Sequence, residues 1–142
     1  MNKNKLFFFL FIVFIIIMLI IGGIYIIHKK QKDCYTNAQE KRIDLYLNEN
    51  LNGYKNLTLT NTKISPMGAF EIEGYVNHDK KLDFKASIWS EDNNQFEYSM
   101  SFSPELSEML KQSNSSRKKA SEIIKEKHLN KEDYEADPPL FF

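Results

Sequence analysis

The chain has 142 residues and a formal net charge of zero, from 19 basic and 19 acidic side chains. The charges are unevenly placed, because residues 33–142 hold all 19 acidic but only 14 basic residues, a net charge of −5. A net-negative domain argues against nucleic-acid binding, which requires a basic surface. The single cysteine, Cys34, excludes an internal disulfide, so a hydrophobic core must supply the stability.

The first predicted element is an uncharged apolar run from Leu6 to Ile27. As a helix its 22 residues are about 33 Å long, enough to cross a bilayer core of about 30 Å. We therefore predict that residues 1–32 form a transmembrane anchor with a basic juxtamembrane segment, and that Phe9 and Ile17, with Leu6 and Ile27 at the ends, contact lipid.

Alternatives to an uncut transmembrane helix stay open. Gly22 and Gly23 offer small residues to a signal peptidase, although signal peptides usually have a shorter apolar core of about 7–15 residues. Lipidation of Cys34 is a further alternative, but residues 31–33 do not form the lipobox that it needs. Cys34 could also form an intermolecular disulfide.

Charge does not fix the orientation in the membrane, because lysines flank the apolar run on both sides. The very short N-terminal segment before the apolar run favours an N-terminus inside the cell. We expect a single-pass protein of the cell membrane whose folded domain, residues 33–142, is extracellular.

An amphipathic helix is predicted over residues 33–51, capped by Asp33 or Thr36 and followed by Gly53 where a left-handed residue is wanted. Its apolar positions recur at helical spacing. They are Tyr35, Ala38, Ile43, Tyr46, Leu47 and Leu51.

Four strands should follow, because β-forming residues dominate the first and apolar and polar residues alternate in the others. They cover residues 57–64, 70–76, 82–89 and 96–102. Ser65–Gly68, 78–81 and 91–94 are the predicted turns. This pattern indicates an antiparallel meander with one covered face and one solvated polar face that carries Glu71 and Glu73.

Helices are predicted after the strands. A short helix begins at Ser103 and Pro104, and a second helix covers Arg117–His128. The basic run Arg117–Lys119 at the start of the second helix is expected to be solvated, or to contact lipid headgroups or an acidic partner. Residues 130–133 can cap one more turn around Tyr134. The order of these elements predicts an α+β fold, similar to the cystatin fold, in which an antiparallel sheet packs around a helix.

No catalytic or metal-binding constellation rises above background, so we expect neither an enzyme nor a cofactor. A dyad of Cys34 with His78 or His128 would use the least constrained positions of the chain. An enzyme would need a pocket around His78 or around the face that carries Glu71 and Glu73.

A binding role is better supported. Trp89 is the only tryptophan, and the alternation places it on the polar face of the third strand, near Tyr75 on the neighbouring strand. Exposed aromatic side chains on a sheet are typical binding anchors. We predict that Trp89 and Tyr75, with Glu71 and Glu73, bind a protein partner. The alternative is that a loop or the C-terminal tail covers the two aromatic side chains. The end of that tail, Leu140–Phe142, is expected to pack on its own domain.

Several short segments resemble those of one protein family over about residues 35–142. They are Lys41–Leu47, Ser65–Gly68, Ile72–Asn77, Ser121–Lys125 and Asp137–Pro139. The family comprises small anchored proteins and lipoproteins of Gram-positive bacteria with a domain of unknown function. Some of its lipoproteins resemble immunity proteins encoded beside antibacterial toxins, lipases among them, that the type VII system exports. The resemblance carries over no functional residues, and Cys34 departs from the lipoprotein members because its lipobox is missing.

Together these patterns predict a membrane-anchored, extracellular protein-binding module, and the resemblance implies an immunity protein that neutralises a secreted toxin such as a lipase. The predicted partners are the lipid bilayer and a protein. The alternative is a structural or assembly component of the cell envelope that acts through its transmembrane helix, where Gly22 and Gly23 allow close helix packing.

Overall fold

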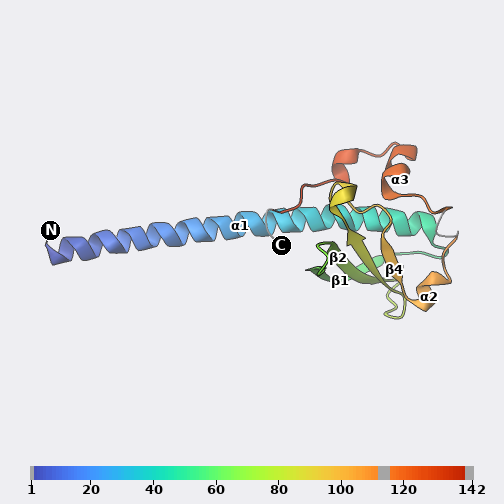
Figure 1. The fold of residues 1–142 in the computed structure, drawn as a ribbon, viewed down its shortest axis with the longest axis horizontal. Coiled ribbons are helices and arrows are strands. Elements are labelled where there is room, and N and C mark those ends of the chain that lie inside the picture. Colours follow the sequence, from blue (N-terminus) through green and yellow to red (C-terminus); the bar gives the residue numbers. More distant parts are fainter. Residues whose placement is uncertain (1, 112–115, 140–142) are drawn as a thin grey trace.

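The computed structural model describes residues 2–111 and 116–139. One long helix, α1 (Lys3–Asn50), dominates the molecule: its N-terminal part stands free, and its C-terminal part is the central element of a folded domain (Figure 1). Its apolar N-terminal part makes it the one helix in these residues that is long and apolar enough to cross a membrane.

Helix α1 is continuous, so the prediction that a separate helix starts with a cap at Asp33 or Thr36 is wrong. No glycine or proline lies between Ile27 and Tyr35, and adding residues to a helix that already exists costs little, so nothing stops it there. The helix ends as the sequence indicates. Leu51 is its C-cap, and Gly53 follows with a left-handed φ of 70°.

The four predicted strands form one antiparallel sheet in the order β1-β2-β3-β4, which confirms the meander and the α+β class. The strands are β1 (Leu57–Ile64), β2 (Phe70–Val76), β3 (Asp83–Ile88) and β4 (Met100–Phe102). The first two have the predicted bounds, because the turn sequences Ser65–Gly68 and 78–81 follow them.

The turns between the strands also follow the sequence. The Gly68 N–H donates to the Ser65 carbonyl at 2.9 Å, and Gly68 has a φ of 88°. In the turn that precedes β4, Asn93 and Asn94 both have a φ of 55°, which asparagine tolerates better than most residues.

Strand β4 is shorter than predicted, since residues 96–99 lie outside it. Two side chains of α1 bind the backbone of Phe96: the Gln39 side-chain oxygen accepts from its N–H at 2.7 Å, and Arg42 Nε donates to its carbonyl at 2.7 Å. At Phe96 these bonds replace the β-ladder, whereas the Ser99 carbonyl still accepts from the Ser87 N–H at 2.8 Å. The Phe96 ring is nevertheless fully buried, edge-on against Tyr46.

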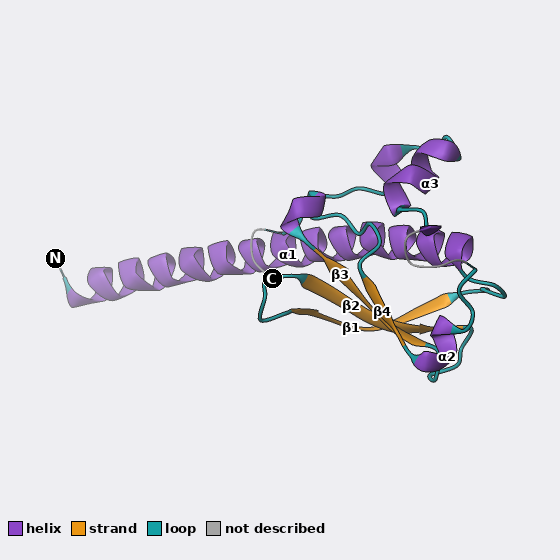
Figure 2. Ribbon diagram, turned by 45° about the vertical axis from the view of Figure 1, so that its right-hand side comes forward, coloured by secondary structure: helices purple, strands orange, loops and turns teal. Residues whose placement is uncertain are grey.

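The domain has three layers, with α1 in the middle. One side of α1 packs on the inner face of the sheet, and α3 (Ala120–Glu126) lies on the other side, where Ile123 and Ile124 pack against Leu45 (Figure 2). Helix α3 begins at Ala120 rather than at Arg117. Arg117 is half-buried, with its guanidinium 5.2 Å from the Phe102 ring centre, so it is not part of a solvated run.

The remaining elements are short. Ser103 caps α2 (Pro104–Ser107) by accepting from the Leu106 N–H at 3.3 Å, as predicted. Asn130 caps the 3-10 turn η3 (Lys131–Asp133), and η1 (Ser90–Asp92) follows β3. The segment Leu140–Phe142, which was expected to pack on the domain, lies outside the described residues.

Candidate functional site

The candidate site is the face of the sheet that points away from α1, here called the outer sheet face. The register places on it Asn61, Lys63, Glu71, Glu73, Tyr75, Asp83, Lys85, Ser87 and Ser101, with Trp89 just beyond β3. Helices α1 and α3 both lie on the inner side of the sheet (Figures 1 and 2). All four residues predicted to bind a partner, Trp89, Tyr75, Glu71 and Glu73, therefore share this face.

The two glutamates belong to an ion-pair cluster. The Glu71 carboxylate lies 3.7 Å from Lys63 Nζ and 3.6 Å from Lys85 Nζ, on the two neighbouring strands. Glu73 accepts a hydrogen bond from Lys63, which holds the pKa of Glu73 below its ordinary value. Acids and bases alternate across the strands, so the pair of carboxylates is charge-balanced and does not resemble a catalytic acid–base pair.

Glu71 is less solvated than the sequence indicated, because it is only 9% exposed. It lies on β2, a central strand, between the side chains of Lys63 and Lys85. Long lysine stems from both neighbouring strands cover it. The expectation of a uniformly solvated polar face is therefore wrong at Glu71.

Tyr75 and Trp89 do not lie near each other, contrary to the expectation. Tyr75 pairs with Asp83 at the start of β3, whereas Trp89 follows Ile88, which pairs with Phe70 at the start of β2. Six residues of extended chain separate Asp83 from Trp89, which is about 20 Å. The two aromatic side chains mark opposite ends of the outer sheet face.

Trp89 is partly covered by its own sheet. It is half-buried, and its indole N–H donates to Ser99 Oγ at 3.4 Å. The described residues thus leave part of Trp89 accessible, while its indole N–H is bound within the protein. Such a side chain can contribute apolar area to a contact.

A groove of about 670 Å³ opens at the Tyr75 end of the outer sheet face. Polar and charged side chains form part of its walls, from Glu73, Tyr75, Lys80, Asp83, Lys85 and Ser101. Gly74 and the ring of Phe84 also line it. Because both signs of charge and an aromatic ring meet there, the groove suits a polar peptide segment better than a small apolar ligand.

The sequence analysis missed a buried polar cluster on α1. Arg42 is 1% exposed, forms an ion pair with Glu97, and lies 3.6 Å from the Glu135 carboxylate. Burial lowers the pKa of the guanidinium, and the carboxylates of Glu97 and Glu135 oppose that shift. Next to it, Gln39 donates to the Gln95 side chain at 2.7 Å.

This cluster joins three segments of the chain. Gln95 donates onward to the Ala136 carbonyl at 2.9 Å, and the Tyr35 hydroxyl donates to the Asn94 carbonyl at 2.6 Å. One feature of the sequence indicates this buried polar cluster. Gln39 and Arg42 fall on the same helical stripe as Tyr35 and Tyr46, so two polar residues occupy core positions.

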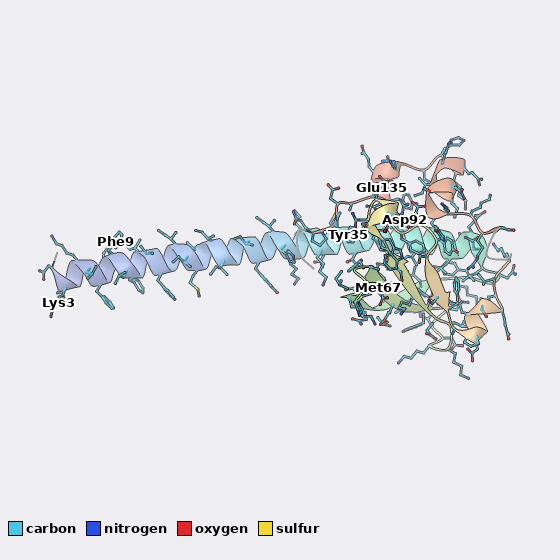
Figure 3. All side chains as sticks on the ribbon, viewed as in Figure 1. Lys3, Phe9, Tyr35, Met67, Asp92 and Glu135 are labelled. Atoms are coloured by element: carbon cyan, nitrogen blue, oxygen red, sulfur yellow. The ribbon has the colours of Figure 1, made fainter. Side chains whose placement is uncertain are left out.

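The predicted lipid-contacting residues all lie on the free part of α1, and all four side chains are exposed (Figure 3 labels Phe9). They are Leu6, Phe9, Ile17 and Ile27. Gly22 and Gly23 lie on the same part, with open space around the position of a Cβ atom. Nothing in the described structure covers this apolar surface.

The residues considered for catalysis lie apart. Cys34 is exposed, one residue before Tyr35, which packs against Phe70. His78 lies beyond Val76, at the other end of β2. His128 follows α3 with a φ of 52°. Within residues 2–111 and 116–139, no group of three His, Cys, Asp or Glu side chains could hold a metal ion.

Comparisons with known proteins find one family and one solved structure. The family model of a protein of unknown function, DUF1433, matches residues 35–125. The solution NMR structure of a folded 79-residue fragment of Lin0334 from Listeria innocua is 31% identical, with a TM-score of 0.52, and the match covers 68% of this chain and 98% of that one. No curated protein matches the chain.

Proposed function

The chain belongs to the DUF1433 family, whose function is unknown, so we propose its function from its own architecture: it is a membrane-anchored module that binds a protein partner on its outer sheet face. The observation that carries this proposal is the outer sheet face itself. It combines an ion-pair cluster, a groove of about 670 Å³ and two aromatic side chains, and none of the described helices covers it.

The anchor is the free part of α1. Its apolar residues are exposed over a length that matches a bilayer core, which supports a single membrane span. A binding domain held on a membrane by a helix meets membrane-localised partners at a high effective concentration. We propose that the domain lies outside the cell, where it can meet a secreted partner.

The partner class that best fits the resemblance and the anchor is a secreted toxin that acts at the membrane, such as a lipase. The domain would then neutralise the toxin by binding, as an immunity protein does. We propose no catalytic activity: the two glutamates of the outer sheet face are paired with lysines, and Cys34 and His78 lie at opposite ends of the domain.

Site-specific crosslinking in intact cells tests the binding proposal. A photo-crosslinking residue at Tyr75 should give an adduct with one protein, whereas the same residue at Lys125 should not, because Lys125 lies on α3, across α1 from the sheet. The adduct can then be purified and identified. Equal adducts from both positions, or none from Tyr75, would overturn the proposed face.

The orientation has a separate test. Cys34 is exposed and is the only cysteine, so a membrane-impermeant maleimide reports on which side of the membrane the domain lies. We expect labelling in intact cells. Labelling that appears only after lysis would place the domain inside.

A second candidate function is an envelope structural or assembly component that acts through the span. The open surface at Gly22 and Gly23 favours it, because small residues allow another helix to approach closely. Replacing residues 6–27 by an unrelated apolar span distinguishes the two candidate functions. Function should survive the exchange if the outer sheet face carries it, and should be lost if the span does.

A further inference from the structure

We propose that the turn between β1 and β2, together with Ile64, is a second membrane contact that seats the folded domain on the headgroup layer of the bilayer holding α1. This surface, Ile64–Gly68, is called the hairpin tip below. The inference rests on the proposed membrane span and goes beyond it, because it concerns a part of the domain that is remote from α1 in sequence.

The height of the domain above the membrane is fixed by α1. The helix runs without a break from the end of the apolar run at Ile27 to Tyr35, the first residue of the domain core. Eight residues of helix rise about 12 Å. The headgroup region adds about 5–8 Å to each side of the hydrocarbon core. The domain core thus begins just above the headgroups.

The hairpin tip points back toward the membrane. Tyr35 contacts Phe70, the first residue of β2, with ring centres 5.4 Å apart, and β2 runs from there toward the far end of the domain. The residues before Phe70 therefore lie on the side of Tyr35 that faces the apolar run. Figure 3 shows Met67 at this end of the domain.

The chemistry of the hairpin tip suits the membrane interface. Met67 is 82% exposed and Ile64 is 43% exposed, and together with Tyr98 they are the exposed large apolar side chains of the described domain. No charged residue lies between Ile64 and Phe70. An exposed, uncharged, partly apolar turn at headgroup level can bury its side chains in the interface instead of in water.

The charges around the hairpin tip favour a lipid contact on its side of α1. Lys29, Lys30 and Lys32 lie on α1 just above the apolar run, where they can attract anionic headgroups. The acidic residues of η1, Glu91 and Asp92, lie across α1 from the hairpin tip (Figure 2). Lipid is therefore the occupant that the surroundings of the hairpin tip favour.

Spin-label accessibility in the full-length chain tests this contact. In a Cys34→Ser background, single cysteines at Met67, Lys80 and Ile17 carry a nitroxide label, and the chain is inserted into vesicles of phosphatidylcholine and phosphatidylglycerol. Lys80 lies in the turn after β2, at the far end of the domain, and Ile17 reports on the span. A water-soluble nickel complex and oxygen then probe each label.

We expect the label at Met67 to collide with the nickel complex several-fold less often than the label at Lys80. Inserting seven helix-forming residues between Lys32 and Asp33 lifts the domain by about 10 Å and turns it by almost two full turns, so it keeps its facing. In that variant the label at Met67 should become as accessible as the label at Lys80.

Two results would overturn the proposal, and they are distinguishable. If the label at Ile17 is in lipid but Met67 is as accessible as Lys80, or is unchanged by the insertion, the hairpin tip does not touch the membrane. If the label at Ile17 is itself in water, the span is wrong, and this contact is wrong with it.

Discussion

Arg42 of α1 forms a buried ion pair with Glu97, which lies 55 residues further along the chain. The Arg42 side chain is 1% exposed and that of Glu97 is 13% exposed. The same guanidinium binds the Phe96 carbonyl and approaches Glu135. One arginine thereby holds the segment before β4 and the C-terminal segment against the central helix.

Replacing Arg42 by methionine should destabilise the domain strongly. The Phe96 carbonyl would lose the Arg42 donor, and the Glu97 carboxylate would lose its ion-pair partner and keep the hydrogen bond from the Ser121 N–H. Removing one partner of a buried pair costs about 3 kcal/mol or more. Urea unfolding of the full chain in nanodiscs, followed by the fluorescence of Trp89, the single tryptophan, measures the loss.

The matched control for that prediction is Lys41→Met, one residue earlier on the exposed side of α1. Its free energy of unfolding should stay within about 0.5 kcal/mol of the parent, as for most surface changes. Similar losses for the two variants would contradict the role given to Arg42.

Alanine at Gly74 should also destabilise the domain. A Cβ atom there would lie 2.4 Å from the Thr58 carbonyl oxygen and 2.9 Å from Cζ of Phe84. Strand β1 or the Phe84 ring must move, and overpacking of this kind costs about 1–3 kcal/mol. Gly22→Ala, where nothing lies within 4 Å, is the control and should leave the unfolding curve unchanged. An unaltered curve for Gly74→Ala would contradict the close approach.

Acid should weaken the ion-pair cluster of the outer sheet face. The hydrogen bond from Lys63 lowers the pKa of Glu73 below 4.5 in the folded chain. The unfolded chain therefore binds the proton more readily, so this stabilisation is complete above about pH 4.5 and is lost as the pH falls through the folded pKa. The effect is small, because solvent screens the pair.

The variant Glu73→Gln isolates this effect. Its stability should fall less steeply than that of the parent between neutral pH and pH values below 4.5, the ordinary pKa of the group. Glu105→Gln, on exposed α2, is the comparison and should keep the parental slope. Identical slopes for parent and Glu73→Gln would show that the pair does not contribute.

If a partner binds the outer sheet face, the losses from Tyr75→Ala and Trp89→Ala should add. The register separates these residues by about 20 Å, and distant sites without shared contacts are additive within about 0.5 kcal/mol. Affinities of the partner for the two single variants and the double variant give the coupling. A coupling well above that limit would mean that the two aromatic residues share one contact.

The sequence determined the local elements of this protein. A run of β-forming residues predicted the bounds of β1, and alternation of apolar and polar residues predicted those of β2. Ser65–Gly68 predicted the turn between them, and Ser103 predicted the cap of α2. The exposed apolar part of α1 also follows from composition alone. Each of these features depends on residues that are close together in the chain, so periodicity and turn chemistry suffice to find them.

Only the tertiary structure decided which residues from distant segments meet. It removed residues 96–99 from β4 by binding Phe96 to Gln39 and Arg42, and it placed Tyr75 and Trp89 at opposite ends of one face. It also buried Glu71 between two lysines and turned the hairpin tip toward the free part of α1. Strand register and buried polar contacts join residues that are far apart in sequence, and a local pattern holds no information about them.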